Sequence, residues 1–306
     1  MNAIVHQLLG LHCETPLHAG GSAKEAVIDL PIQKEAHTGW PCVYGSSMKG
    51  ALRTQAEMQG MDTLLLTQAF GPDTENASEH AGALLVGDAR LLLLPVRSLT
   101  SHFKWVTCPA LLRRLLSDLA RIGQSPAALT LPSVADGDAL TVKAPPPSHA
   151  DLYLEEFRFA ARHWDDHTQA QGWLTLISSL LAPISGVDSA EQHAALEEQL
   201  TVVDNNSFSH LCQSALPVLP HIRINTATKT VAHGALWYEE NLPAETLLYT
   251  VLSCQPSRKP EHAATAEALL QQVLDQLFAP PYLQIGGNET TGMGWVRVGR
   301  FPVAGH

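Results

Sequence analysis

The chain has 306 residues, of which 45% are hydrophobic and 16% are charged, and its net charge is −11. This length is enough to bury a sizeable core in one large domain or in two small ones. The acidic balance lacks the basic footprint typical of an isolated nucleic-acid-binding domain. A subunit of a larger assembly escapes that rule, because its partners and any bound nucleic acid contribute to the electric field.

The cysteines and the N-terminus point to a cytoplasmic protein. Five scattered cysteines without a Cys-x-x-Cys pair indicate reduced thiols, most of them buried. The first residues, MNAIVHQLLGLHC, lack the basic segment and the cleavage site of a signal peptide. No apolar run approaches the roughly 20 residues of a membrane span. We therefore expect a soluble, cytoplasmic protein without membrane contact.

Strand-like and helix-like segments are interspersed along the chain. Apolar runs predict strands at residues 4–13, 84–94, 247–253 and 295–298. The second run is apolar almost throughout, which is typical of a strand buried on both faces. Apolar residues at helical spacing predict helices at 109–122, 191–200 and 261–278. Such a mixture indicates a domain that combines helices and strands.

Two polar regions interrupt this pattern. Residues 124–149 are rich in Ser, Pro, Gly and Asp, and we expect a surface insertion there. Residues 204–230 are irregular and polar at first, and apolar and polar side chains then alternate at 222–225. This pattern predicts a hairpin that exposes every second side chain to a ligand. The sequence shows neither an internal repeat nor a long linker, so we expect a single domain over residues 1–306.

The first candidate site is a helix expected to open at Ser46 and Ser47. It places Lys49 and Arg53, four residues apart, on one face. The unpaired N–H groups and the positive end of the helix dipole add to that charge, and helix N-termini are common phosphate sites. The same spacing also fits an ordinary capped helix with a solvated face.

The second candidate site is Asp29 with His18, on a loop made pliable by Gly20 and Gly21. A carboxylate beside an imidazole can serve acid–base chemistry or hold a divalent ion. RNA carries its own nucleophile, the 2′-hydroxyl, so a single group that orients or deprotonates it can suffice. In the alternative interpretation Asp29 caps a turn and His18 is an incidental surface residue.

Two further segments could approach a nucleic acid. The loop 285–294 contains four glycines, including Gly286 and Gly287, whose amides can come close to a polyanion. It matches neither G-x-G-x-x-G nor a Walker A motif, and a simple glycine-rich hairpin explains it equally. Residues 234–240 place aromatic side chains beside Glu239, which suits base stacking and a second carboxylate. A half-buried strand end is the other interpretation.

The 15 histidines do not form a zinc motif, because none falls in H-E-x-x-H spacing or in a cysteine pattern. The chain also lacks the G-x-S-x-G elbow of serine hydrolases. Zinc chemistry and hydrolysis through a serine elbow are therefore not expected.

Several segments together resemble one protein family. They are TPLHAGGSAKEAVIDLPIQKEAHTGWP, YGSSMKGALR, VRSLTSHFKWVTCPALLRR, IRINTATKTVAHGALWYEENLPAETLLY and LQIGGNETTGMGWVRV. In family order and over nearly the whole chain, they resemble the backbone subunit of type III-B CRISPR effector complexes, the Cmr branch of the RAMP superfamily. DLPIQKEAHTG and WVTCP favour this branch over the related type III-A subunit.

The resemblance implies an α+β fold with a modified RRM-like (ferredoxin-like) palm. The N- and C-terminal parts would build the palm, a helical insertion would occupy roughly residues 97–200, and a β-hairpin thumb would occupy roughly residues 205–240. Copies of such a subunit stack along the crRNA. Each thumb then interrupts the duplex between guide and target RNA at regular intervals, and other subunits complete the complex.

The resemblance also implies an activity. Asp29 matches the family's catalytic aspartate, which cuts target RNA in the presence of Mg²⁺ or Mn²⁺ and is itself a possible metal ligand. The expected products carry a 2′,3′-cyclic phosphate and a 5′-hydroxyl. His18 and Glu239 fall near the family's site. The residues implied in RNA binding are Ser46, Ser47, Lys49, Arg53, Gly286, Gly287 and, on the hairpin, Arg223.

Other interpretations of the sequence stay open. The chain could be a purely structural crRNA-binding backbone subunit, with another subunit cutting the target, or the equivalent subunit of a type III-A complex. A small-molecule enzyme that uses the glycine-rich loop for phosphate is a further alternative. A cleavage assay on the assembled complex separates the first of these from an endoribonuclease.

Overall fold

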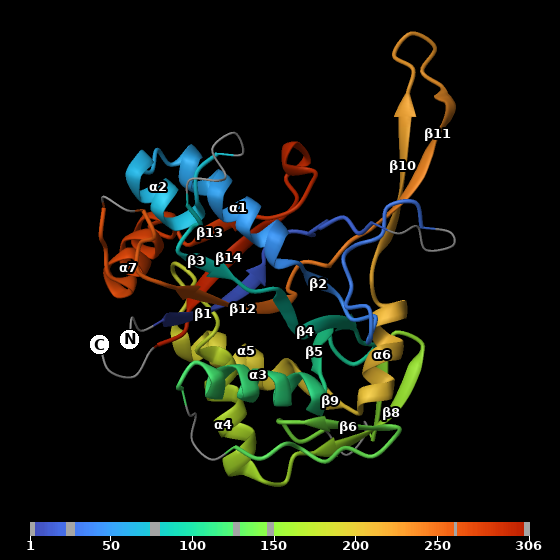
Figure 1. The fold of residues 1–306 in the computed structure, drawn as a ribbon. Helices are drawn as coiled ribbons and strands as arrows, with labels where there is room; N and C mark the ends of the chain where they lie inside the picture. Colours follow the sequence, from blue (N-terminus) through green and yellow to red (C-terminus); the bar gives the residue numbers. More distant parts are fainter. Residues whose placement is uncertain are drawn as a thin grey trace.

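The computed structural model describes residues 4–22, 28–73, 80–124, 129–145, 150–259 and 262–302. A large mixed sheet with helices on both faces forms the body, and a two-stranded hairpin projects from it (Figure 1). No helix within these ranges is long and apolar enough to cross a membrane.

The sheet joins the two ends of the chain. Its strands follow in space as β13 (Tyr282–Gln284), β14 (Trp295–Arg300), β1 (Val5–Cys13), β12 (Leu247–Cys254), β4 (Ala89–Arg97), β5 (Phe103–Thr107), β9 (Leu200–Val203), β6 (Asp138–Thr141), β8 (Phe157–His163) and β7 (Asp151–Leu154). In addition, β2 (Cys42–Val43) pairs with β4, and β3 (Leu84–Val86) pairs with β12. The pairs β5–β9 and β6–β8 are parallel. Because β1 lies between β14 and β12, the N- and C-terminal segments form one continuous layer.

Helices cover both faces of the sheet (Figure 1). On one face lie α1 (Gly45–Met58), α2 (Thr63–Phe70) and α7 (Ala266–Leu277), and on the other lie α3 (Pro109–Arg121), α4 (His167–Ser178) and α5 (Ser189–Gln199). β12 is buried at every position: Leu248 and Leu252 belong to the first core, whereas Tyr249 and Val251 belong to the second. This alternation is what a strand packed on both faces requires.

Most of the elements predicted from the sequence are present, with two changes of boundary. The predicted strand at 84–94 is divided into β3 and β4, which both pair antiparallel with β12, because the ladder is irregular at Gly87 and Asp88 and its register shifts by one residue there. The predicted helix at 261–278 begins at Ala266, where the Thr265 side chain caps it by accepting the N–H of Ala268 at 3.2 Å. Residue 261 itself lies outside the described ranges.

The prediction that Ser46 and Ser47 open α1 as caps was wrong. The helix begins at Gly45, and Tyr44 occupies the cap position without a side-chain hydrogen bond. The first N–H is instead satisfied from another segment, since the Asp88 carboxylate accepts from Gly45 at 2.7 Å. A carboxylate supplied from outside the helix cannot be read from helix-capping patterns, which are local.

The projecting hairpin consists of β10 (Val218–Ile224) and β11 (Val231–Glu240). The first ten residues of the range expected for it form α6 (Asn205–Ser214), which Asp204 caps by accepting from Asn206 and Ser207. The region expected as a helical insertion contains α3, α4 and α5, but also β5 to β8. It therefore extends the sheet as well as covering it. Within the expected surface insertion at 124–149, residues 125–128 and 146–149 lie outside the described ranges.

The five cysteines are free and buried, as expected. Burial raises the pKa of Cys108 and Cys254 to about 11, and that of Cys13 and Cys42 to about 12. The thiolate is the reactive form, so these thiols are poor nucleophiles at neutral pH.

A charged cluster at the end of β1 predicts how stability depends on pH. The His12 ring and the buried Arg297 guanidinium lower the pKa of the Glu14 carboxyl to about 2, from an ordinary value of 4.5. The contribution of Glu14 to stability is therefore complete above pH 4.5 and is lost as the pH falls toward 2. In denaturant titrations at a series of pH values, Glu14→Gln should flatten the decrease in unfolding free energy across this window. An unchanged slope would contradict this assignment.

Candidate active site and nucleic-acid interface

Asp29 lies at the foot of the hairpin, on an extended segment that runs beside β11. Leu30 forms a parallel bridge with Glu239. Its N–H donates to the carbonyl of Tyr238 at 3.0 Å, and its carbonyl accepts the N–H of Glu240 at 3.0 Å. The Asp29 carboxylate accepts the N–H of Tyr238 at 3.0 Å. Backbone pairing thus fixes this carboxylate relative to β11.

His18 and Glu239 form a buried pair next to this segment. They are only 8% and 4% exposed, and 3.9 Å separates His18 Nδ1 from Glu239 Oε1. Asn288, from the glycine-rich loop, donates to the same oxygen at 2.6 Å. His18 Nδ1 bonds the carbonyl of Glu240 at 2.8 Å. Because a carbonyl only accepts, this partner places the proton on Nδ1.

A second imidazole faces the same carboxylate. His221 of β10 stacks on Trp237 with ring centroids 5.6 Å apart, and its Nε2 lies 3.9 Å from Glu239 Oε1. The stacking fixes the ring, since these two residues are paired across the hairpin. Glu239 is therefore the centre of a polar cluster contributed by three separate segments.

The glycine-rich loop packs directly against His18. Gly287 donates its N–H to the His18 carbonyl at 2.9 Å. Gly286 has φ of +84°, and a Cβ there would lie 2.3 Å from the same carbonyl oxygen. Both the left-handed backbone and the close approach require glycine at this position. Of the predicted site residues, the structure thus gathers His18, Glu239, Gly286 and Gly287, and backbone pairing places Asp29 beside them.

A groove of about 640 Å³ separates α1 from the glycine-rich loop. Its walls include Ser47, Gln55 and Met58 from one side and Gly286, Glu289 and Trp295 from the other. Two residues expected to contact RNA, Ser47 and Gly286, therefore face one another across it.

The two cations of α1 differ in their surroundings. Arg53 pairs with Glu57 at 2.9 Å and with Asp73, and it donates to the carbonyl of Gly71 at 3.2 Å. Lys49 has no ion pair with any carboxylate of the described ranges. Ser46 is exposed at the start of the same helix. Within the described part of the chain, Lys49 is thus the cation of this pair whose charge is not offset locally.

Arg223 does not join the cluster at Glu239. It is exposed on β10, farther from the body than His221, where the register of the hairpin shifts between Ile222 and Ile224. This position suits a contact made by the projecting part of the hairpin.

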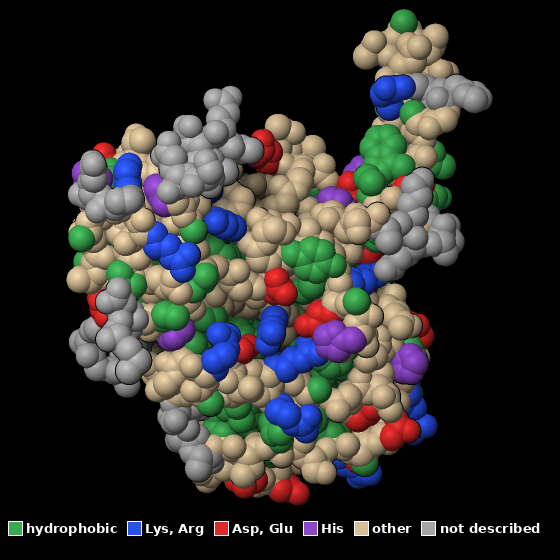
Figure 2. Space-filling view, viewed as in Figure 1, with side chains coloured by type: hydrophobic (Ala, Val, Ile, Leu, Met, Phe, Trp, Pro, Cys, Tyr) green, Lys and Arg blue, Asp and Glu red, His purple; other side chains and the backbone are tan. Residues whose placement is uncertain are grey.

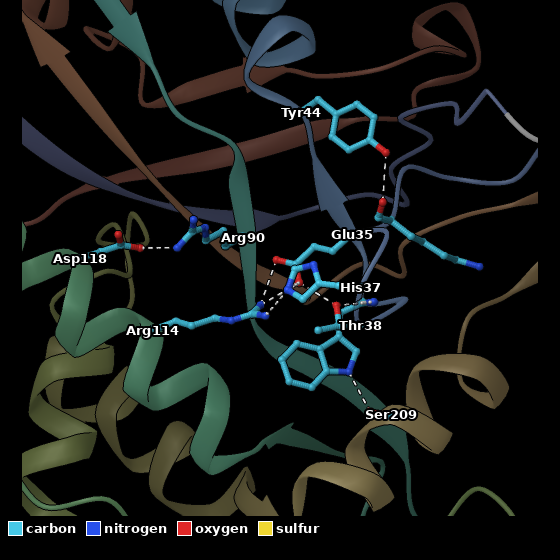
Figure 3. A network of polar contacts seen from close by, with 10 residues as sticks. Glu35, His37, Thr38, Tyr44, Arg90, Arg114, Asp118 and Ser209 are labelled. Carbon is cyan, nitrogen blue, oxygen red and sulfur yellow. Dashed lines mark hydrogen bonds and ion pairs between the residues drawn. The ribbon is translucent and has the colours of Figure 1, made fainter.

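The connection between Asp29 and α1 is held by polar contacts within itself and with Arg114 of α3 (Figure 3). Arg114 donates from one nitrogen to both oxygens of Glu35, at 2.9 and 2.8 Å, and its guanidinium lies 4.7 Å from the centre of the Trp40 ring. Tyr44 donates its hydroxyl hydrogen to the carbonyl of Lys34 at 3.0 Å. These contacts limit the freedom of the chain that carries Asp29.

Sequence reasoning missed several contributors to this site, namely Gln33, Lys34, His221, Glu240 and Asn288. Gln33 donates to the Ser47 hydroxyl at 2.9 Å and to the Gly20 carbonyl at 3.2 Å, so it links α1 to the loop beside His18. An acidic pair at a strand end usually indicates a solvated surface. Only the fold reveals that both Glu239 and Glu240 are buried.

Among the candidate site residues, Asp29 is the one considered as a ligand for a divalent metal ion. Within the described ranges, no three His, Cys, Asp or Glu side chains come together as a metal-binding group. Mg²⁺ often takes only one or two protein carboxylates and completes its shell with water and substrate phosphate. A single carboxylate such as Asp29 is compatible with that mode of binding.

Comparison with known proteins identifies the class to which this architecture belongs. Residues 11–297 match the RAMP superfamily, and the chain belongs to it. It is 35% identical to the CRISPR system Cmr endoribonuclease Cmr4 of Pyrococcus furiosus, over 95% of this chain and 94% of that protein. The resemblance to the Cmr branch is thereby confirmed.

Solved structures agree in fold. Oligomeric Cmr4 from Pyrococcus furiosus superposes with a TM-score of 0.73 at 27% identity, covering 99% of this chain and 100% of that one. A chain of the type III-B Cmr-beta complex bound to cognate target RNA gives a TM-score of 0.71 at 22% identity, with 97% of each chain covered. The large mixed sheet with helices on both faces is therefore shared with these proteins.

Proposed function

We propose that this chain is a backbone subunit of a crRNA-guided type III-B effector complex and a metal-dependent endoribonuclease. It binds crRNA along a filament of its own copies in the cytoplasm and cuts complementary target RNA at regular intervals. The observation that carries the proposal is the position of Asp29. Its carboxylate accepts an N–H of β11 at the foot of the hairpin, and its neighbour Leu30 bridges Glu239, which forms a buried pair with His18.

The chemistry required of the protein is modest. The 2′-oxygen of the target RNA attacks the adjacent phosphorus and the bond to the 5′-oxygen breaks. The departing 5′-oxygen takes a proton from water, so the products are a 2′,3′-cyclic phosphate and a 5′-hydroxyl. Asp29 orients the 2′-hydroxyl and accepts its proton. His18, Glu239 and Asn288 hold the neighbouring loops in place through their mutual contacts. A Mg²⁺ or Mn²⁺ ion held by Asp29 would neutralise charge developing on the phosphate.

The hairpin supports the role of a thumb that acts outside its own subunit. Large apolar side chains are 40% to 53% exposed along it: Val218, Leu219, Ile222, Ile224, Val231 and Leu236. Figure 2 shows hydrophobic side chains on this projection. An isolated two-stranded hairpin is marginally stable in water. Contact with RNA or with a neighbouring copy would cover these side chains, and the sheet with α1 and the glycine-rich loop would then serve as the palm.

The path proposed for crRNA follows α1 and the glycine-rich loop. Ser46, Ser47, Lys49, Arg53, Gly286 and Gly287 would contact its backbone, and Arg223 would add a contact from the hairpin. The supporting observations are the groove between α1 and the loop and the charge of Lys49, which no carboxylate of the described ranges offsets. Phosphate contacts of this kind are independent of sequence, as a guide of variable sequence demands.

The test is cleavage of a labelled, guide-complementary RNA by the reconstituted complex with Mg²⁺ or Mn²⁺. A ladder of evenly spaced products that depends on Asp29 supports the proposal. Intact target binding without such a ladder would favour the purely structural alternative.

The two cations of α1 should differ in their effect on RNA binding. Lys49→Gln should weaken crRNA binding and lower the slope of log affinity against log salt by about 0.7 to 1, as expected for one lost phosphate contact. Arg53→Gln should weaken binding less, because Glu57 and Asp73 already offset its charge. Fluorescence anisotropy of labelled crRNA over a range of salt concentrations measures both. Equal slopes for Lys49→Gln and the wild type would remove Lys49 from the interface.

A further inference from the structure

Glu240 attaches the Asp29 segment to β11 through its side chain. One carboxylate oxygen, Oε2, accepts the N–H of Ile32 at 3.1 Å, and the other, Oε1, pairs with the Lys34 ammonium at 3.0 Å. Ile32 lies three residues after Asp29, within the same extended segment. The Glu240 side chain thus fastens this segment at two points just beyond the candidate catalytic carboxylate.

The backbone of Glu240 adds two more contacts. Its N–H donates to Leu30, the residue next to Asp29, at 3.0 Å, and its carbonyl bonds His18 Nδ1 at 2.8 Å. One residue therefore contacts both chain segments that carry Asp29 and His18. It is only 3% exposed, so water does not compete for these bonds.

We infer that Glu240 is a positioning residue of the RNA-cleaving site, which sets the register of the Asp29 segment against β11. The inference rests on the proposed function. Glu240 acts through the peptide of Ile32 and through Lys34 rather than by touching RNA. Catalytic groups must be held close to their productive geometry, and small displacements reduce the rate of reaction strongly. The expected defect is therefore in the rate of cleavage rather than in RNA affinity.

The chemistry of the contacts makes glutamine the informative replacement. Both oxygens of the carboxylate accept hydrogen bonds, and both partners, the Ile32 N–H and the Lys34 ammonium, are donors. Glutamine has the same shape but only one acceptor. In Glu240→Gln the amide nitrogen must face one of these donors, so one of the two attachments is lost while the volume of the side chain is kept.

The experiment uses the assembled complex with saturating target and measures single-turnover cleavage, target affinity and assembly. Glu240→Gln should slow cleavage by about tenfold or more, in the range expected for a misplaced catalytic group, and should leave assembly and target affinity unchanged. Asp118→Asn is the matched control, because Asp118 is also a buried carboxylate, paired with Arg90 on β4 and hydrogen-bonded to Tyr249 on β12. It should cut at the wild-type rate once assembled.

A second variant tests the coupling of the pair. Lys34→Met removes the ammonium donor that conflicts with the new amide of Glu240→Gln. The double variant Lys34→Met/Glu240→Gln should therefore cleave about threefold or more faster than Glu240→Gln alone, because the effects of substitutions at contacting residues are not additive. Four outcomes would each overturn the inference. Glu240→Gln could cleave at the wild-type rate, or the double variant could fail to recover the rate. Target binding could be lost, or both variants could fail to assemble. Absence of cleavage by the wild-type complex would instead refute the proposed function, so the two failures are distinguishable.

Discussion

Asp29→Asn should abolish target cleavage in the assembled complex while leaving RNA binding near normal. The asparagine oxygen can still accept the N–H of Tyr238, so the segment keeps its hydrogen bond to β11. The negative charge and the proton acceptor are lost. We expect the cleavage rate to fall by about 100-fold or more, the range typical of removing a general base. Quantifying the product ladder against time measures this effect.

A matched control is available on α2. Asp62 also accepts backbone N–H groups, from Leu64 and Leu65, but it caps a helix away from the hairpin. Asp62→Asn should cut RNA normally, because asparagine is an equivalent helix cap. A ladder that survives in a cleanly purified Asp29→Asn complex would move the chemistry to another subunit and leave this chain as a structural backbone.

Gly286→Ala should both destabilise the protein and impair cleavage. At φ of +84° a non-glycine residue costs about 1–2 kcal/mol in backbone strain. The new methyl group would also lie 2.3 Å from the carbonyl oxygen of His18, and such overpacking typically costs about 1–3 kcal/mol more. Relief of that clash must move His18 or the loop. Denaturant unfolding of the isolated chain and cleavage by the complex should therefore both show defects.

Gly292 in the same loop separates these two effects. Its φ of +83° imposes the same backbone strain, but apart from Gly292 itself and its two chain neighbours, no atom of the described ranges lies within 4 Å of the place that a methyl group would occupy. Gly292→Ala should lower stability only through this backbone strain and should leave cleavage unchanged. If both variants cut RNA equally well, the contact between Gly286 and His18 has no role in catalysis.

The sequence predicted the parts of the site that lie in local patterns. Local patterns made Asp29, His18 and the glycine-rich loop candidates, and the family resemblance implied the catalytic role of Asp29, which remains a prediction. The start of α1 was predicted wrongly, since its first N–H group bonds Asp88, 43 residues away in the chain. The hairpin was expected over 205–240 but begins at Val218, because Asp204 caps α6 first. Several residues near each boundary could cap a helix, and the sequence alone did not show which of them does so.

By itself, the sequence determined the family and the mixture of helices and strands, and it named the candidate residues of the proposed RNA-cleaving site. Periodicity and motif order are properties of the chain, and they persist without knowledge of distant contacts. Only the tertiary structure decided which of these residues meet. It buried Glu239 and Glu240, supplied Asn288 and His221 to Glu239, and paired Arg53 with acids while leaving Lys49 available. Burial and pairing depend on segments far apart in sequence, which come together only when β1 pairs with β12 on one side and with β14 on the other.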